Sequence, residues 1–216
     1  MRLLFIRLAT SLGYYLLGLL YGFRIDGIEN LPESGPYILS QNDLSQMGDA
    51  ATAIAMLRLI FSGRMPEPVS LGDEYNWAME PWGWLFAMGD SVPVPRGPGQ
   101  AVTAYLSAIR GLREGRVVAI NPEGETSWEG RLVTAKPAAA YVALRTGAPI
   151  VLLVATKGAY DACPKWAERP QLTGRFVVRI GKPFRVTDSP CAKVSEEMVA
   201  EANRTIEQQM TALIYH

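Results

Sequence analysis

Short apolar runs alternate with longer amphipathic stretches along most of this chain. Three apolar runs end in polar or glycine-containing turns and are expected to be strands, at residues 37–40, 117–120 and 149–155, and residues 66–71 are expected to form another strand. Extended segments are also expected at residues 23–28, 91–95 and 174–180, and helices at residues 50–60, 100–114, 138–145 and 195–214. Strands that are apolar throughout are typical of parallel sheets covered by helices on both faces. The pattern predicts an α/β domain with a central, mostly parallel sheet flanked by helices.

The first stretch of the chain is almost wholly apolar. Residues 8–23 carry no charged side chain. This run is shorter than the ~20 residues that cross a hydrocarbon core, although a count from residue 3, with Arg7 reaching the surface, meets that length. Three tyrosines suit an interface between lipid and water: Tyr14, Tyr15 and Tyr21.

We expect residues 1–22 to form a membrane-associated helix that lies in or dips into one leaflet. The alternative is a helix packed on the core of the domain itself. A cleaved signal peptide fits less well, because Arg7 interrupts the start of the apolar run and no small-residue cleavage pattern follows.

Length and composition narrow the remaining possibilities. The 216 residues leave room for one α/β domain over residues 23–216. Lysine and arginine total 21, the same as aspartate and glutamate, so we expect no nucleic-acid partner. Cys163 and Cys191 lack a metal-binding spacing and are expected to be free thiols in a reducing compartment, with no metal site. The only histidine is His216, which removes Ser-His-Asp, Cys-His and metal-histidine chemistry.

Polar residues follow two of the predicted buried strands. Residues 41–49 come directly after the strand at 37–40, and Asn-Pro-Glu-Gly ends the strand at 117–120. Ligands in open α/β sheets bind outside the carboxyl ends of the strands. Both turns are therefore candidate site segments, with Asn42, Asp43, Ser45, Asp49, Glu123 and Gly124 as the candidate residues.

Each of these residues also has a purely structural interpretation. Asp49 is placed to cap the helix predicted at residues 50–60. Asp43 and Ser45 are residue types that form side-chain turns with their own backbone. Glu123 fits an ordinary solvated position in a connecting turn.

Three further features suit a lipid or phosphate ligand. Lys136 precedes the helix predicted at residues 138–145, where backbone N–H groups also favour an anion. Arg96 closes an extended segment before a glycine, so its guanidinium can be presented to a phosphate. Residues 76–89 hold three tryptophans and two methionines, which can line a groove for a hydrocarbon chain or pack in the core. The nucleophile-elbow, Walker and dinucleotide-binding motifs are absent from the sequence.

Four stretches, in this order along the chain, resemble the glycerolipid acyltransferase family, which includes 1-acylglycerol-3-phosphate acyltransferases. They are residues 42–49, 89–96, 121–127 and 148–154. The turn at residues 27–32 and the Gly181-Lys182-Pro183 segment are also typical of this family, and the likeness spans roughly residues 23–186. The resemblance implies the family's single-domain α/β fold with an N-terminal membrane-associated helix.

The resemblance also implies a reaction in phospholipid biosynthesis. A fatty acyl group would move from an acyl-carrier-protein or coenzyme A thioester to the hydroxyl of a lysophospholipid or related glycerolipid. The thioester is a co-substrate, and no cofactor is implied. The expected location is the membrane, at the cytoplasmic face of a bacterial inner membrane.

Site roles follow from the matched motifs. Asp43 and Asp49 stand for the catalytic pair of the first motif. Substrate binding is assigned to Asn42, Ser45, Arg96, Glu123, Gly124 and Lys136. Among these, Arg96 would hold an acceptor phosphate, and Lys136 lies where the family commonly has a lysine.

The chain departs from the family at the catalytic base. Asp43 stands where the family has histidine, and Asp49 lies one residue later than the family aspartate. An ordinary aspartate is a weaker base than histidine by about 3.5 kcal/mol, which corresponds to a rate loss of up to a few hundredfold. Two hypotheses stay open: an acyltransferase that uses Asp43, and a catalytically impaired pseudoenzyme that binds lipid or acyl thioester.

Overall fold

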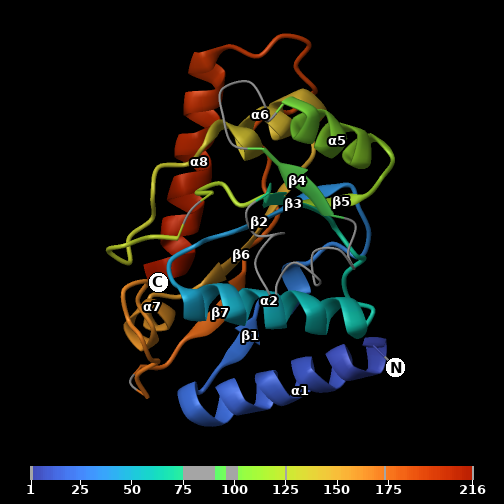
Figure 1. Cartoon of the computed structure of the whole chain (residues 1–216). Helices are drawn as coiled ribbons and strands as arrows, with labels where there is room; N and C mark the ends of the chain where they lie inside the picture. Colours follow the sequence, from blue (N-terminus) through green and yellow to red (C-terminus); the bar gives the residue numbers. More distant parts are fainter. Residues whose placement is uncertain (1, 75–90, 96–101, 125, 173, 216) are drawn as a thin grey trace.

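The computed structural model describes residues 2–74, 91–95, 102–124, 126–172 and 174–215 (Figure 1). The helices are α1 (Arg2–Tyr21), the short 3-10 helix η1 (Ile28–Asn30), α2 (Gln46–Phe61), α5 (Val102–Arg113), α6 (Pro137–Thr146), α7 (Gly158–Ala162) and α8 (Glu196–Tyr215). The strands are β1 (Arg24–Asp26), β2 (Tyr37–Gln41), β3 (Val69–Asp73), β4 (Ser91–Val94), β5 (Val117–Ala119), β6 (Ile150–Ala155) and β7 (Val177–Ile180).

The described strands form one seven-stranded sheet in the order β1-β7-β6-β2-β5-β3-β4. Every neighbouring pair is parallel except β6 with β7. All six residues of β6 are buried, as expected for a strand covered on both faces. The predicted mostly parallel sheet is therefore confirmed.

Helices cover both faces of this sheet (Figure 1). Ile38 of β2 points into a core shared with α5, α6 and α8, whereas Leu39 points into a second core shared with α2 and α7. Neighbouring strand residues alternate between the two cores because successive side chains of a strand point to opposite faces. The sheet is thus the middle of three layers, and the carboxyl ends of β2 and β5 lie at one edge.

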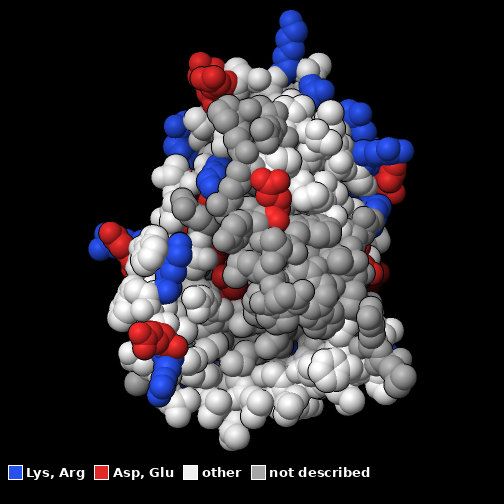
Figure 2. Space-filling model, in the orientation of Figure 1, with Lys and Arg blue, Asp and Glu red and all other residues white. Residues whose placement is uncertain are grey.

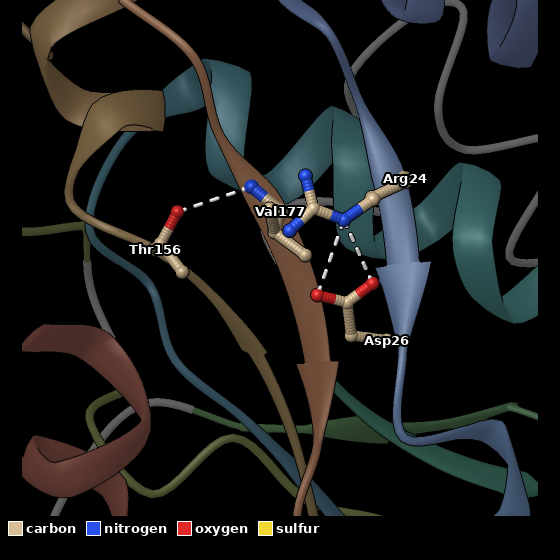
Figure 3. Close-up of polar contacts among 4 residues, drawn as sticks. All are labelled: Arg24, Asp26, Thr156 and Val177. Carbon is tan, nitrogen blue, oxygen red and sulfur yellow. Dashed lines mark hydrogen bonds and ion pairs between the residues drawn. The ribbon is translucent and has the colours of Figure 1, made fainter. Parts of the chain in front are cut away.

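The antiparallel β6–β7 pair is a feature that the apolar pattern does not predict. Thr156 continues the pairing beyond β6: its N–H donates to the Val177 carbonyl at 3.0 Å, and its hydroxyl accepts from the Val177 N–H at 3.1 Å (Figure 3). Gly158 brings the start of α7 so close to the chain before β7 that an added Cβ would lie 2.2 Å from the Arg175 carbonyl oxygen. The short helix α7, missing from the predicted elements, therefore packs against the chain just before β7, so that the segment between β6 and β7 returns to the edge of β6.

The outer strand β1 carries an exposed ion pair. Arg24 Nε lies 2.9 Å from Asp26 Oδ1, on the same face of the strand (Figure 3). Opposite charges on an exposed strand at the end of a sheet hinder pairing with another chain.

Helix α1 lies along α2 on the side away from the sheet (Figure 1). The Arg58 guanidinium carbon lies 4.1 Å from the centre of the Tyr14 ring, and that of Arg7 lies 5.2 Å from the Phe61 ring. Gly13 allows this close packing, since an added Cβ would lie 3.0 Å from Ile54 Cδ1. One face of α1 is therefore attached to the domain.

The opposite face of α1 is apolar and exposed. Its large exposed side chains are Leu3, Leu4, Phe5, Leu8, Leu12, Tyr15, Leu16, Leu19 and Leu20. The segment Leu3–Tyr21 has a mean hydropathy of 1.7 and the length of a membrane span, and only 11% of its most apolar window is buried. The lower edge of the molecule, where α1 lies, is almost free of charge (Figure 2).

Candidate functional site

The first side chain of the loop after β2 makes two hydrogen bonds to the backbone of β6. Asn42 is buried, and its amide nitrogen donates to the Ala155 carbonyl at 2.9 Å while its amide oxygen accepts from the Ala155 N–H at 2.8 Å. Asn42 thus mimics a strand residue and holds the end of β2 against the end of β6. A role for Asn42 in binding substrate stays a prediction.

Helix α2 begins earlier than its sequence pattern predicts. It starts at Gln46, four residues before the predicted start at residue 50, and its N-cap is Ser45, whose hydroxyl accepts from the Gly48 N–H at 3.0 Å. The prediction that Asp49 caps this helix is therefore wrong. Because the buried Ser45 satisfies the helix end, Asp49 lies inside the first turn with its carboxyl available to neighbouring groups.

Helix α2 is closely packed at Gly48, the residue before its acidic residue. Gly48 occupies the place of the family aspartate, and a Cβ added there would lie 3.5 Å from Ala155 Cβ and 3.9 Å from Ala159 Cβ. The nearest atom to such a Cβ would be the Ser45 hydroxyl oxygen at 3.4 Å, so position 48 is closely surrounded by the N-cap and two alanines. The acidic residue of the first turn of α2 is Asp49.

Glu123 joins the loop after β5 to the loop after β2. The Asp43 N–H donates to Glu123 Oε1 at 2.8 Å, and the Val133 N–H donates to Glu123 Oε2 at 2.8 Å. A second bond runs between the same two loops, since the Ser127 N–H donates to the Asp43 carbonyl at 2.8 Å. Glu123 is only 1% exposed, so the alternative that it is an ordinary solvated residue of a connecting turn is wrong.

The three carboxyl groups Asp43, Asp49 and Glu123 lie close enough to interact. The Asp43 and Asp49 side chains are hydrogen-bonded, and burial together with Asp43 raises the pKa of Asp49 to about 9. Two carboxyl groups that hydrogen-bond to each other share a proton, and the raised pKa of Asp49 keeps a proton on this pair at neutral pH. The sequence-predicted residues of the two loops thus meet in one acidic cluster.

Burial also raises the pKa of Glu123, to about 7. Its two backbone hydrogen bonds favour the charged form, but repulsion from Asp43 and Glu207 adds to the effect of burial. Since burial outweighs the hydrogen bonds, Glu123 changes charge near neutral pH.

A lysine lies at the border of the acidic cluster. Lys136 is exposed and is the residue before α6, and its Nζ donates to the Gly124 carbonyl at 3.4 Å. Gly124 has a φ of 65°, and a Cβ there would lie 3.0 Å from Lys136 Nζ. A side chain at position 124 would therefore be strained and would push this ammonium group away.

Two sequence predictions fall outside the described residues: the phosphate-binding role of Arg96 and the apolar groove of residues 76–89. Conversely, the sequence gives no sign that Asn203 and Glu207 of α8 reach this region. Both are polar positions of an amphipathic helix, where exposed and contacting side chains look alike. Within the described part of the chain, no group of three or more His, Cys, Asp or Glu side chains is arranged to hold a metal ion.

The fold and the site define an α/β protein with paired carboxyl groups at the carboxyl ends of parallel strands. A family model described as Acyltransferase matches residues 22–155, which is more than half of the chain. The chain belongs to this acyltransferase family.

A solved structure has the same fold. It is the crystal structure of the 1-acyl-sn-glycerophosphate (LPA) acyltransferase PlsC from Thermotoga maritima, with a TM-score of 0.66 and 22% sequence identity. The match covers 94% of this chain and 77% of that chain. A comparison of the sequence with curated proteins gives no match. The resemblance to glycerolipid acyltransferases is thus confirmed at the level of family and fold.

Proposed function

We propose that this protein transfers a fatty acyl group from an acyl-carrier-protein or coenzyme A thioester to the hydroxyl of a lysophospholipid or related glycerolipid. Membership of the acyltransferase family supports the reaction class. The likeness in fold to an LPA acyltransferase makes a lysophospholipid the first acceptor to test.

The observation that carries the proposal is the convergence of carboxyl groups from two distant loops. Asp43 and Asp49 are hydrogen-bonded, and the backbone of Asp43 is held by Glu123 at 2.8 Å. An isolated solvated aspartate is a poor base, whereas repulsion between the Asp43 and Glu123 carboxylates favours protonation of Asp43 and makes it a stronger one.

In the proposed step, the Asp43 carboxylate takes the proton of the acceptor hydroxyl, and the hydroxyl oxygen attacks the carbonyl carbon of the thioester. The C–O bond forms, the C–S bond breaks, and the sulfur leaves as a thiolate that receives the proton from Asp43. Protonated Asp49 donates a hydrogen bond to Asp43 and fixes its orientation. We assign Lys136 to the acceptor or thioester side because its cation is exposed at the border of the site.

We further propose that α1 holds the protein on a membrane without crossing it. One face of α1 is bound to α2 and the other exposes a row of apolar side chains. This arrangement suits a helix lying in the plane of the interface, next to a lipid acceptor. On this proposal, residues 1–22 are the anchor and residues 23–216 the catalytic domain, placed at the cytoplasmic face of a bacterial inner membrane.

The test uses the full-length protein in vesicles with radiolabelled acyl-carrier-protein or coenzyme A thioesters and a panel of lysophospholipids. We expect acylated product from at least one donor and acceptor, and its loss in Asp43→Asn. As a matched control, Asp188→Asn removes an exposed carboxylate and is expected to keep the activity. A folded protein without transfer from any donor would reject the proposal.

A pseudoenzyme that binds lipid or acyl thioester is the second candidate. It is favoured by the contacts of two candidate substrate-binding side chains, since both Glu123 oxygens and both polar groups of the Asn42 amide bind backbone groups of the protein itself. Binding of a non-hydrolysable acyl thioester without turnover would support this alternative.

A further inference from the structure

Helix α8 holds a segment that carries no regular structure of its own. This segment, residues 132–136, is called the strap here. The Ala135 N–H donates to Glu207 Oε1 at 2.7 Å, and Asn203 Nδ2 donates to the Ala135 carbonyl at 2.9 Å. Asn203 and Glu207 are four residues apart and so lie on the same face of α8.

The strap in turn holds the acidic cluster. Val133, two residues before Ala135, donates its N–H to Glu123 Oε2 at 2.8 Å. Lys136, the next residue, donates its N–H to the Pro122 carbonyl at 2.7 Å. Two residues of α8 are thus connected to Glu123 through a few backbone bonds.

The helix that supplies these two side chains is packed into the core. Ala202, Ile206 and Met210 of α8 are buried next to α6, and this packing places Asn203 and Glu207 at the strap. Ala135 is itself buried, so both of its backbone polar groups need partners. Without the two side chains, the Ala135 N–H and carbonyl would need hydrogen bonds from water, and the strap would have to move to expose them.

We propose that Asn203 and Glu207 are positioning residues of the acyl-transfer site: they clamp the strap, and the Glu207 carboxylate adds a negative charge next to Glu123. The effect on catalysis rests on the proposed function, whereas the clamp itself does not. The titratable groups that interact with Glu123 are Asp43 after β2, Asp49 of α2 and Glu207 of α8, and the Lys136 ammonium group lies beside the next residue, Gly124. Among these, Glu207 is the one supplied by the C-terminal helix.

Two substitutions separate the hydrogen bond from the charge. Glu207→Gln keeps an oxygen that accepts from Ala135 but removes the charge, whereas Glu207→Ala removes both. Glu201→Gln is the matched control, because Glu201 is exposed on the same helix and pairs with Arg204. Asn203→Ala removes the second bond of the clamp.

The first readout is amide hydrogen exchange in the full-length protein, which needs no activity. We expect the Val133 and Ala135 amides to exchange about tenfold faster in Glu207→Ala, with β6 unchanged, and to stay within about twofold of wild type in Glu207→Gln and Glu201→Gln. Unchanged exchange at both amides in Glu207→Ala would overturn the clamp.

The second readout is the pH titration of the Glu123 carboxyl, followed by infrared difference spectroscopy against Glu123→Gln. Loss of the Glu207 charge is expected to lower the midpoint in Glu207→Gln and leave it unchanged in Glu201→Gln. An unshifted midpoint in Glu207→Gln would overturn the electrostatic part.

In the active enzyme, Asn203→Ala and Glu207→Ala are expected to lower kcat more than they change the KM for the donor, and Glu207→Gln to shift the pH profile of kcat. Equal activity in all variants would overturn the positioning role. If the wild type transfers no acyl group, the proposed function fails, while the exchange and titration results still decide the clamp.

Discussion

The backbone N–H of Asp43 donates to Glu123 Oε1 at 2.8 Å, joining two loops that are 80 residues apart in the sequence. This bond holds the candidate base by its main chain, and the Asp43 side chain is hydrogen-bonded to Asp49. Glu123 therefore determines where Asp43 lies without using the Asp43 carboxyl.

Replacing Glu123 with alanine is expected to destabilise the protein. The Asp43 and Val133 amides would lose their shared acceptor, and a buried unsatisfied group costs about 1–3 kcal/mol. We expect the free energy of unfolding, measured by urea denaturation, to fall by roughly 2–4 kcal/mol. Glu129→Ala, at an exposed position of the same loop, serves as the control and should have almost no effect. A similar small effect in Glu123→Ala would contradict the bridging role.

Introducing histidine at position 43 is expected to raise acyl transfer. Histidine is the stronger base at neutral pH, so kcat/KM should rise by up to a few hundredfold if proton removal limits turnover. We would measure kcat/KM by steady-state kinetics with one labelled thioester, for wild type, Asp43→His and Asp43→Asn. Binding of the thioester without any gain in Asp43→His would favour the pseudoenzyme.

Stability is expected to fall as pH rises, because burial raises the pKa of both Asp49 and Glu123 in the folded protein. The folded state then binds more protons than the unfolded state, so the stabilisation is complete below about pH 4 and decreases through the raised pKa values. Above pH 7, the remaining decrease belongs to Asp49, whose pKa is raised to about 9.

The substitution Asp49→Asn tests this assignment. Asparagine resembles the protonated carboxyl, so the variant should lose less stability than wild type between pH 7 and pH 9, by about 1–3 kcal/mol or several degrees in Tm. Thermal unfolding at several pH values measures the slope, with Asp188→Asn as control. Parallel slopes in wild type and Asp49→Asn would show that Asp49 is not the group responsible.

Charges on the exposed face of α1 are expected to weaken membrane binding. Leu8→Glu with Leu12→Glu removes two apolar side chains from the interface, each worth about 1.5–3 kcal/mol when fully buried, so the partition coefficient should fall at least about tenfold. Vesicle co-sedimentation measures it. Leu106→Glu, at an exposed leucine of α5 on the other side of the sheet, should bind as wild type does. Equal loss in this control would point to a general effect of charge and against α1.

The strands and the long helices were predictable because their signals are local. The apolar run of β6 and the spacing of α8 identify those elements without any neighbour, and strand ends followed by polar turns identify the site edge. The combination of four motifs was sufficient to predict the family. The capping of α2 was not predictable, since Ser45 and Asp49 are both suitable caps, and the choice depends on packing around Gly48.

The sequence by itself determined the strand and helix pattern, the acyltransferase resemblance, and the absence of a histidine from every position except 216, because these depend on residue type and order. The tertiary structure decided that β7 runs antiparallel to β6, that Glu123 binds two backbone amides and that α8 reaches the strap. These features depend on groups up to 80 residues apart becoming neighbours. A local pattern carries no information about such neighbours, since many polar positions on turns and helices are equally compatible with water.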